Sequence, residues 1–206
     1  MAPTENEFVT FEITDVAPIA VAKKYAGIAA SLVAHIKNTR TPFSIDFGVG
    51  DVIVPKQEKR KIPTQLDDFA SPTVNTYSLE TTIAEKLDAI LDLMEFSSRM
   101  KDYYDIYYLA NKFDFDGGTL TKALKKTFEN RGHAFTIEQF EQVMAFAEND
   151  AMQKKWKAFC RKIDTKTADF NTVLKTIKEF LIEPFIAMVE NKEFDEKWTA
   201  ADGRWI

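Results

Sequence analysis

The chain has 206 residues, of which 45% are hydrophobic and 29% charged, so it is long enough to bury one sizeable core or two small ones. Its formal net charge of -5 argues against a nonspecific nucleic-acid coat, because such binding depends on many Lys and Arg side chains that neutralise phosphates. Its apolar stretches fall short of the ~20 residues that a membrane-spanning helix requires, and no secretory leader opens the sequence, so we expect a cytoplasmic protein without a membrane partner.

The first third of the chain is strand-like. Residues 8–13 alternate in part between apolar and polar side chains, residues 28–36 are apolar and small, and residues 42–55 alternate around two glycines. Such segments predict three or four β-strands. The polar, proline-containing stretch over residues 56–72 is expected to be a long connection to the second half of the chain.

Two glycines interrupt the last of these strand-like segments. Gly48 and Gly50 predict a turn or bulge between SIDF and DVIV, with Asp46 inside a strand and Asp51 beside the bend. Either carboxylate could be a functional acid, and a carboxylate in this setting could equally cap a turn.

From Tyr77 onward the apolar residues recur with a period near 3.6, which predicts helices. The first helix could be capped by Ser78, and its apolar stripe consists of Ile83, Leu87, Ile90 and Met94. Further helices are expected over residues 101–112, 151–163 and 170–189. Another helix is expected to end at a C-terminal cap at Gly132, and another to begin at a capping box formed by Thr136 and Gln139. The sequence therefore predicts an α+β protein, with a β region and linker over residues 1–76 and a helical domain over residues 77–206.

The segment SSRMKDYYDIYYL concentrates charges among four tyrosines. On a helix, Arg99 and Asp102 are three residues apart and Lys101 and Asp105 are four apart, so two opposite-charge pairs can form on neighbouring turns. By composition alone a surface salt-bridge network is the simpler interpretation, because such pairs are common and individually worth only ~0.3 to 0.5 kcal/mol.

One lysine of the preceding helix lies at the edge of the buried stripe. Lys86 is three residues after Ile83 and four before Ile90. Its side chain either extends to solvent or points its ammonium group into a cleft, and extension to solvent is the more frequent outcome.

Several motifs in this order resemble those of the AbiEii/AbiGii nucleotidyltransferases, the toxins of bacterial abortive-infection and toxin–antitoxin systems. The segment YSLETTIAEKLDAILDLMEFSSRMKDYYDIYYLANKF resembles the late motifs of the family, a Tyr-x-x-Glu-Thr-x-x-Ala-Glu-Lys helix followed by Ser-Arg-x-Lys-Asp-x-x-Asp. SIDFGVGDVIVP resembles an upstream strand pair, and LKKTFENRG resembles a Thr-Phe-x-x-Arg segment. The resemblance covers about residues 26–132.

The resemblance implies transfer of a nucleoside monophosphate from a nucleoside triphosphate (NTP), with RNA such as tRNA as a plausible acceptor and an antitoxin as a plausible partner. It assigns phosphate binding to Lys86, with Arg99 and Lys101 as further contacts, and catalytic roles to Lys86, Asp102 and Asp105. Mg²⁺ would be held by carboxylates on the strands, because it prefers oxygen ligands. Asp46 is then the metal-site candidate that we favour over the acid beside the bend.

The first motif of active members, a Gly-Ser followed about ten residues later by Asp-x-Asp, is not found before Asp46. Asp114 and Asp116 form an Asp-x-Asp only within FDFDGG, which we interpret as a turn with Asp and Gly at capping or positive-φ positions. The sheet is accordingly expected to be an incomplete nucleotidyltransferase-like sheet, because the chain is truncated or degenerate or because another chain supplies the rest. We expect the isolated chain to lack transferase activity.

Two other classes of function stay open. The chain could be a noncatalytic module that binds a nucleotide or a protein, or one half of a two-chain assembly, including a homo-oligomer formed through an exposed sheet edge. It could also be a plain helical interaction domain, which predicts that Lys86, Arg99, Asp102 and Asp46 point in unrelated directions. The enzyme and the nucleotide-binding module both require these side chains to converge.

Overall fold

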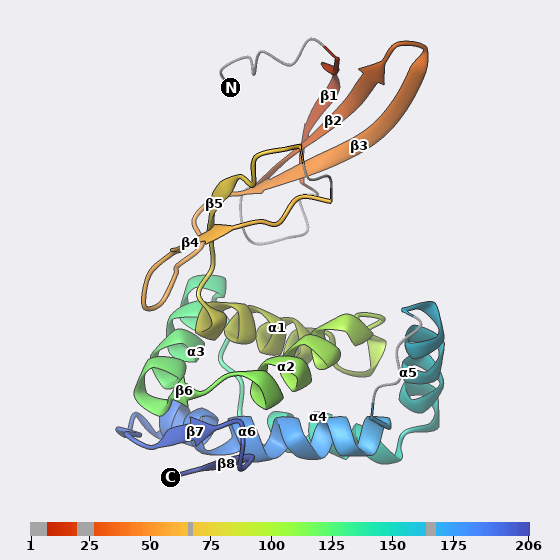
Figure 1. Cartoon of the computed structure of the whole chain (residues 1–206). Coiled ribbons are helices and arrows are strands. Elements are labelled where there is room, and N and C mark those ends of the chain that lie inside the picture. The colour runs from red at the N-terminus through yellow and green to blue at the C-terminus, as the bar shows by residue number, and fades with distance from the viewer. Residues whose placement is uncertain (1–7, 20–26, 66–67, 164–167) are drawn as a thin grey trace. The chain divides into compact units, whose positions relative to one another are not determined.

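The computed structural model describes residues 8–19, 27–65, 68–163 and 168–206, and the chain divides into two compact units, residues 1–51 and 52–206. The first unit is a sheet, and the second is mainly helical (Figure 1). The predicted α+β class is confirmed. The predicted boundary between a β region and a helical domain at residue 76 stays a prediction.

The first unit is an antiparallel sheet of three strands, in the order β1 (Thr10–Pro18), β2 (Gly27–Ile36) and β3 (Thr39–Gly48). Residues paired across the strands share a face, and this register gathers the apolar side chains on one side. There, the rings of Phe11 and Phe43 meet edge to face at 6.0 Å. The apolar face consists of Phe11, Ile13, Val16, Ile28, Ala30, Leu32, Phe43, Ile45 and Phe47.

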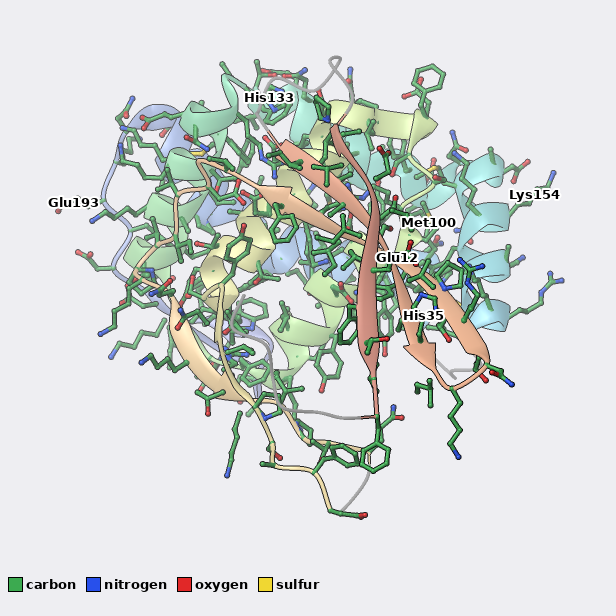
Figure 2. The ribbon with its side chains drawn as sticks, turned by 90° about the horizontal axis from the view of Figure 1, so that it is seen from above. Glu12, His35, Met100, His133, Lys154 and Glu193 are labelled. Carbon is green, nitrogen blue, oxygen red and sulfur yellow. The ribbon has the colours of Figure 1, made fainter. Side chains whose placement is uncertain are left out.

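The opposite face of this sheet is polar. Glu12 and His35, both labelled in Figure 2, lie on it with Oε2 and Nε2 3.1 Å apart. Asp46 lies on the same face, opposite Ala29 of β2. The prediction that Asp46 is inside a strand is therefore confirmed.

The predicted strand DVIV is wrong. Gly50 has φ +98°, a conformation that favours glycine and ends the strand-like run. Beyond it the chain joins the helical unit: the Val54 backbone N–H donates to Thr81 Oγ1 at 2.8 Å, and its carbonyl accepts from the hydroxyl groups of Ser78 and Thr81. Because these bonds satisfy the Val54 backbone and its side chain is buried, the segment needs no strand partner.

The expected long connection over residues 56–72 also contains a strand. β4 (Glu58–Lys61) pairs antiparallel with β5 (Thr73–Thr76) in a separate two-stranded sheet. The sequence EKRK has no apolar alternation, so no pattern predicted it. Its backbone is nevertheless paired along its whole length, and the Arg60 guanidinium binds Glu58 at 2.6 Å.

The helices of the second unit follow the predicted order. They are α1 (Leu79–Leu93), η1 (Met94–Phe96), α2 (Met100–Lys112), α3 (Gly117–Arg131), α4 (Ile137–Met144), η2 (Ala145–Glu148), α5 (Asp150–Lys162) and α6 (Phe170–Glu190). A small sheet in the order β6 (Phe115–Asp116), β7 (Lys197–Thr199) and β8 (Arg204–Trp205) completes the unit. Among the described helices, none combines the length and apolarity needed to cross a membrane.

The predicted helix ends are confirmed. The Ser78 hydroxyl accepts from the Thr81 backbone N–H, and Gly132 ends α3 in the left-handed conformation with φ 67°. Thr136 and Gln139 form both hydrogen bonds of a capping box at the start of α4. These side chains and this glycine satisfy backbone groups that a helix leaves without partners at its ends, so they fix where each helix begins and stops.

The core lies where α6 packs against α2, α3 and α4. Its large side chains are mainly aromatic, and Phe180 packs against Trp198 with ring centroids 4.9 Å apart. Each such buried ring contributes roughly 1.5–3 kcal/mol by its removal from water. The Trp198 indole N–H donates to the Ala110 carbonyl at 2.7 Å, which ties β7 to α2.

FDFDGG is not a simple turn. Phe115 and Asp116 form β6, and Asp116 caps α3 by accepting from the Thr119 backbone N–H at 2.8 Å. The capping role of Asp116 is thus confirmed, but neither following glycine has positive φ. Gly117 is required by close approach instead, because a Cβ there would lie 2.7 Å from the Glu196 carbonyl oxygen.

Candidate functional site

Five of the six predicted site residues lie on or beside two consecutive helices, α1 and α2. The stripe of α1 buries Ile83, Leu87 and Ile90 almost completely. This fixes the rotation of the helix, since apolar residues at this spacing share one face. Lys86 projects from the edge of that stripe, and only 17% of its side chain is exposed.

The Lys86 side chain does not extend freely into solvent but turns its ammonium group toward α2. Its ammonium nitrogen lies 3.2 Å from Asp102 Oδ1 and 2.5 Å from Asp105 Oδ2, both on α2. The Asp102 side chain is 4% exposed and that of Asp105 is 19% exposed. A partly buried cation between two carboxylates is held far more firmly than an exposed pair, because solvent screens it less.

Two further cations bind the same carboxylates from the solvent side. Arg99 Nε lies 2.6 Å from Asp102 Oδ2, and Lys101 Nζ lies 2.5 Å from Asp105 Oδ2. These are the two helix pairs that their spacing predicted, and both are confirmed. The side chains of Arg99 and Lys101 are 57% and 70% exposed, so they are the solvent-exposed members of what we call the Lys86 cluster: Lys86, Arg99, Lys101, Asp102 and Asp105.

Arg99 binds Asp102 by a long hydrogen bond from Nη2 to Oδ1 at 3.5 Å and by an ion pair from Nε to Oδ2. Asp102 Oδ2 is buried and has no aligned donor among the described residues, although Arg99 Nε is only 2.6 Å away. The neighbouring Tyr103 hydroxyl is also buried without a hydrogen-bond partner there. Burial, reinforced by the negative charge of Asp102, raises the pKa of the Tyr103 phenol well above its ordinary value.

The arrangement is suited to an anion. Three cations share two carboxylates, which leaves one positive charge in excess. The cluster also lies around the first turns of α2, and the N-terminal end of a helix carries partial positive charge. A phosphate group can bind the outer cations while the two carboxylates keep the Lys86 ammonium in place.

Asp46 lies on β3 in the first unit, whereas the Lys86 cluster belongs to the second. Within the part of the chain that the structure describes, no three His, Cys, Asp or Glu side chains form a group that could hold a metal ion. Asp102 and Asp105 are taken up by cations. Neither unit by itself therefore holds a complete metal centre among its described residues.

A second ionic cluster on α1 was missed from the sequence. Asp88, whose side chain is 1% exposed, accepts from Arg131 Nη1 at 2.7 Å and lies 2.8 Å from His133 Nδ1. Arg131 also pairs with Glu85. An acid one residue after Leu87, within the apolar stripe, was the signal that could have revealed it, because a buried acid requires a partner.

This second cluster joins α1 to the end of α3. Burial raises the pKa of the Asp88 carboxyl, and the hydrogen bond and charge of His133 oppose that shift. The Arg131 of the LKKTFENRG segment thus contacts two acids of α1, Glu85 and Asp88, rather than the Lys86 cluster. Held by α3 through these acids and by α2 through Lys86, α1 is fixed from both sides.

A protein-family model described as "Nucleotidyl transferase AbiEii toxin, Type IV TA system" matches residues 2–198. The comparison with curated proteins found no match, and neither did the comparison with solved structures. The match extends over nearly the whole chain, including both ionic clusters.

Proposed function

Because the chain belongs to the AbiEii family of nucleotidyl transferase toxins from type IV toxin–antitoxin systems, we propose that its Lys86 cluster binds the triphosphate of an NTP. The observation that carries this proposal is the position of the Lys86 ammonium, 3.2 Å from Asp102 and 2.5 Å from Asp105. These carboxylates orient a cation that would otherwise be mobile, and an oriented cation loses less entropy when a phosphate binds.

Each residue of the cluster has a distinct proposed role. Lys86 is the fixed phosphate contact. Asp102 and Asp105 hold the Lys86 ammonium in position, and the family resemblance also assigns them catalytic roles. Arg99 and Lys101 are exposed, so they can turn from their carboxylates toward the outer phosphates. Arg99 can engage two oxygens with its planar guanidinium group, whereas a lysine acts as a point charge.

The reaction proposed for the family site is transfer of a nucleoside monophosphate to RNA such as tRNA. An acceptor hydroxyl oxygen bonds to the α-phosphorus and the bond from that phosphorus to the pyrophosphate oxygen breaks, so pyrophosphate leaves. The proton of the hydroxyl passes to solvent water. The cations of the cluster would hold the departing pyrophosphate, where negative charge accumulates. The family also makes an antitoxin a proposed partner, and a cytoplasmic location stays a prediction.

We propose that this chain by itself transfers slowly or not at all. The sequence holds no Gly-Ser and Asp-x-Asp pair ahead of Asp46. Asp46 is the carboxylate proposed for Mg²⁺, and the Asp-x-Asp pair that would complete the family's metal site is missing ahead of it.

A second candidate function is a noncatalytic binding module or one half of an assembly. The open sheet of the first unit supports it, because β1 and β3 each pair on one side only among the described strands. An open strand edge is a template for pairing with another chain, including a second copy. Light scattering after size-exclusion chromatography tests the homo-oligomer: a mass of one chain at every concentration would exclude it.

The transfer step is tested by incubating the purified chain with total tRNA and each of the four NTPs, labelled with ³²P at the α-phosphate, in Mg²⁺. We expect no robust labelling of RNA or protein by the chain alone. Robust labelling that is lost in Lys86→Met would show that the missing motif is dispensable. Labelling that survives in Lys86→Met would remove Lys86 from the proposed site.

A further inference from the structure

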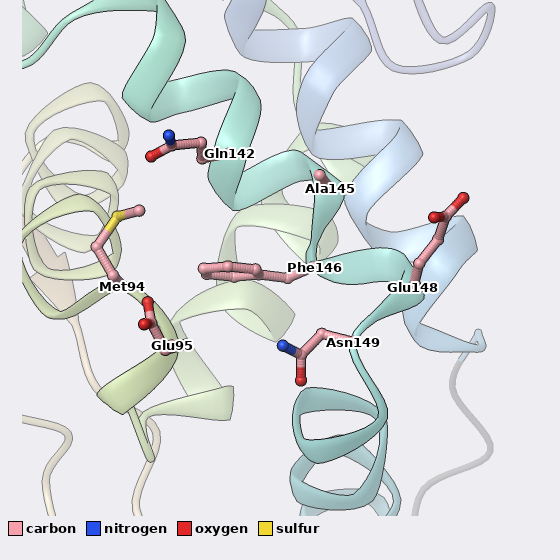
Figure 3. Close-up of a pocket in the computed structure, with 7 residues that line it drawn as sticks. All are labelled: Met94, Glu95, Gln142, Ala145, Phe146, Glu148 and Asn149. Carbon is pink, nitrogen blue, oxygen red and sulfur yellow. The ribbon is translucent and has the colours of Figure 1, made fainter.

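A separate pocket of about 550 Å³ lies in the second unit, between the α1–α2 connection and the α4–α5 connection. Figure 3 shows the side chains around it. The lining residues are Met94, Glu95, Gln142, Ala145, Phe146, Glu148 and Asn149. None of them belongs to the Lys86 cluster, so the pocket is not part of the proposed nucleotide site.

The pocket combines an apolar floor with acceptor groups. Met94 and Phe146 are partly buried and pack against the core, so the floor is fixed. In Figure 3 the Phe146 ring points toward Met94 and Glu95, with Gln142 on one side of the ring and Asn149 on the other. Glu148 points away from this group and forms only part of the rim.

Both walls of the pocket are held by hydrogen bonds. The Lys155 ammonium of α5 donates to the carbonyl oxygens of Glu95 at 2.8 Å and of Ser97 at 2.9 Å. Asn149 Oδ1 accepts from the backbone N–H groups of Ala151 and Met152, which caps α5. The pocket is therefore preformed, and a ligand does not have to order it.

Two of the polar side chains that line the pocket, Glu95 and Gln142, are not used internally. Within the described residues, the Glu95 carboxylate and the Gln142 amide have no hydrogen bond or ion pair. Lys155 binds the backbone carbonyl of Glu95 and not its side chain. A carboxylate, an amide oxygen and an aromatic face together recognise a flat cation with several N–H donors. The negative charge of Glu95 disfavours a phosphate at this place.

We infer that this pocket is a docking site for an arginine side chain on a segment of a partner protein. The guanidinium would donate to the Glu95 carboxylate and to Gln142 Oε1 while it lies against the Phe146 ring, a cation–π contact. The pocket is larger than one side chain, so the residues flanking that arginine would contact Met94 and the rim. An arginine anchored in a preformed aromatic pocket is a frequent source of binding energy at protein interfaces.

The test uses the full chain labelled with ¹⁵N and the peptide acetyl-Leu-Arg-Leu-amide. Its neutral control replaces arginine by citrulline, which has nearly the same shape without the charge. We expect the arginine peptide to shift the side-chain amide signals of Gln142 and Asn149, and the citrulline peptide to bind at least about tenfold more weakly.

Glu95→Gln should lower the affinity for the arginine peptide by a similar factor, because the carboxylate is lost while the shape of the side chain is kept. Glu193→Gln, which removes an exposed carboxylate from a residue that does not line the pocket, should leave binding unchanged. The inference is overturned if the arginine peptide leaves the two amide signals in place. Equal affinity for both peptides, or for the native chain and Glu95→Gln, would also overturn it.

Discussion

The Lys86 ammonium on α1 lies 2.5 Å from Asp105 Oδ2 on α2. The pair joins the two helices that carry the family motifs, and both side chains are less than one-fifth exposed. Because the residues belong to separate helices, their approach depends on how α1 and α2 pack and not on spacing along one helix. This cross-helix contact separates the Lys86 cluster from an ordinary row of helix charge pairs.

Asp102→Asn should lower the free energy of unfolding by about 1–3 kcal/mol, because it removes a nearly buried carboxylate that binds Lys86 and Arg99. Lys101→Ala removes a cation whose side chain is 70% exposed and should change stability by less than about 0.5 kcal/mol. Urea unfolding at pH 7, followed by circular dichroism, measures both. Equal effects would mean that Asp102 is not the structural centre of the cluster.

Tyr103→Phe should leave stability unchanged or raise it by about 1 kcal/mol. The Tyr103 hydroxyl is buried and has no hydrogen-bond partner among the described residues. Folding therefore removes it from water without a compensating hydrogen bond, and Tyr103→Phe abolishes that penalty. The ring keeps its edge contact with Phe170 at 5.4 Å. Thermal and urea unfolding would both show the change. A loss above about 1 kcal/mol would indicate that an ordered water or ligand binds the hydroxyl.

Gly117→Ala and Gly118→Ala form a matched pair at the start of α3. A Cβ on Gly117 would lie 2.5 Å from Phe194 Cδ1 and 2.7 Å from the Glu196 carbonyl oxygen, so we expect a loss of about 1–3 kcal/mol. A Cβ on Gly118 would lie 3.4 Å from the Phe194 carbonyl oxygen, an ordinary contact distance. Because alanine also lowers the entropy of the unfolded chain, Gly118→Ala should leave the free energy of unfolding nearly unchanged. Urea unfolding that ranked the two variants in the reverse order would contradict this geometry.

Asp116→Ala should lower the free energy of unfolding by about 1 kcal/mol at pH 7, because Asp116 caps α3. Hydrogen bonds from the Thr119 hydroxyl and then its backbone N–H lower the pKa of Asp116 below 3.8. A lowered folded pKa gives stability that is complete above 3.8 and is lost as pH falls through the folded value. The difference in free energy of unfolding between the native chain and Asp116→Ala should therefore shrink as the pH falls below 3.8. Asp116→Asn keeps a cap without titrating, so its stability relative to Asp116→Ala should stay constant with pH.

The helical half could be predicted well because its signals are local. Ser78, Thr136 and Gly132 define helix ends through their own side chain or backbone freedom, and the buried stripe of α1 follows from its periodicity. β4 was missed because EKRK presents no apolar face, and its pairing with β5 connects segments on either side of a loop. Val54 was assigned to a strand because residues 42–55 alternate around two glycines, but hydrogen bonds to Ser78 and Thr81 decided its place.

The candidate site was predictable in two different ways. The Arg99–Asp102 and Lys101–Asp105 pairs follow from helical spacing. The approach of Lys86 to Asp102 and Asp105 depends on packing between helices, so only the family resemblance pointed to it. Asp88 was overlooked because its partners Arg131 and His133 lie beyond α2 in the sequence, where no pattern within one helix can reveal them.

The central claim, that the Lys86 cluster binds a triphosphate, is tested most directly by calorimetric titration of the chain with each of the four NTPs in Mg²⁺. Lys86→Met keeps the length of the side chain and removes its charge. Lys126→Met is the matched control, because Lys126 is an exposed lysine of α3 that pairs with Glu129. We predict that at least one NTP binds, that Lys86→Met weakens it at least about tenfold, and that Lys126→Met does not. An absence of binding to the native chain, or equal binding to Lys86→Met, would contradict the account.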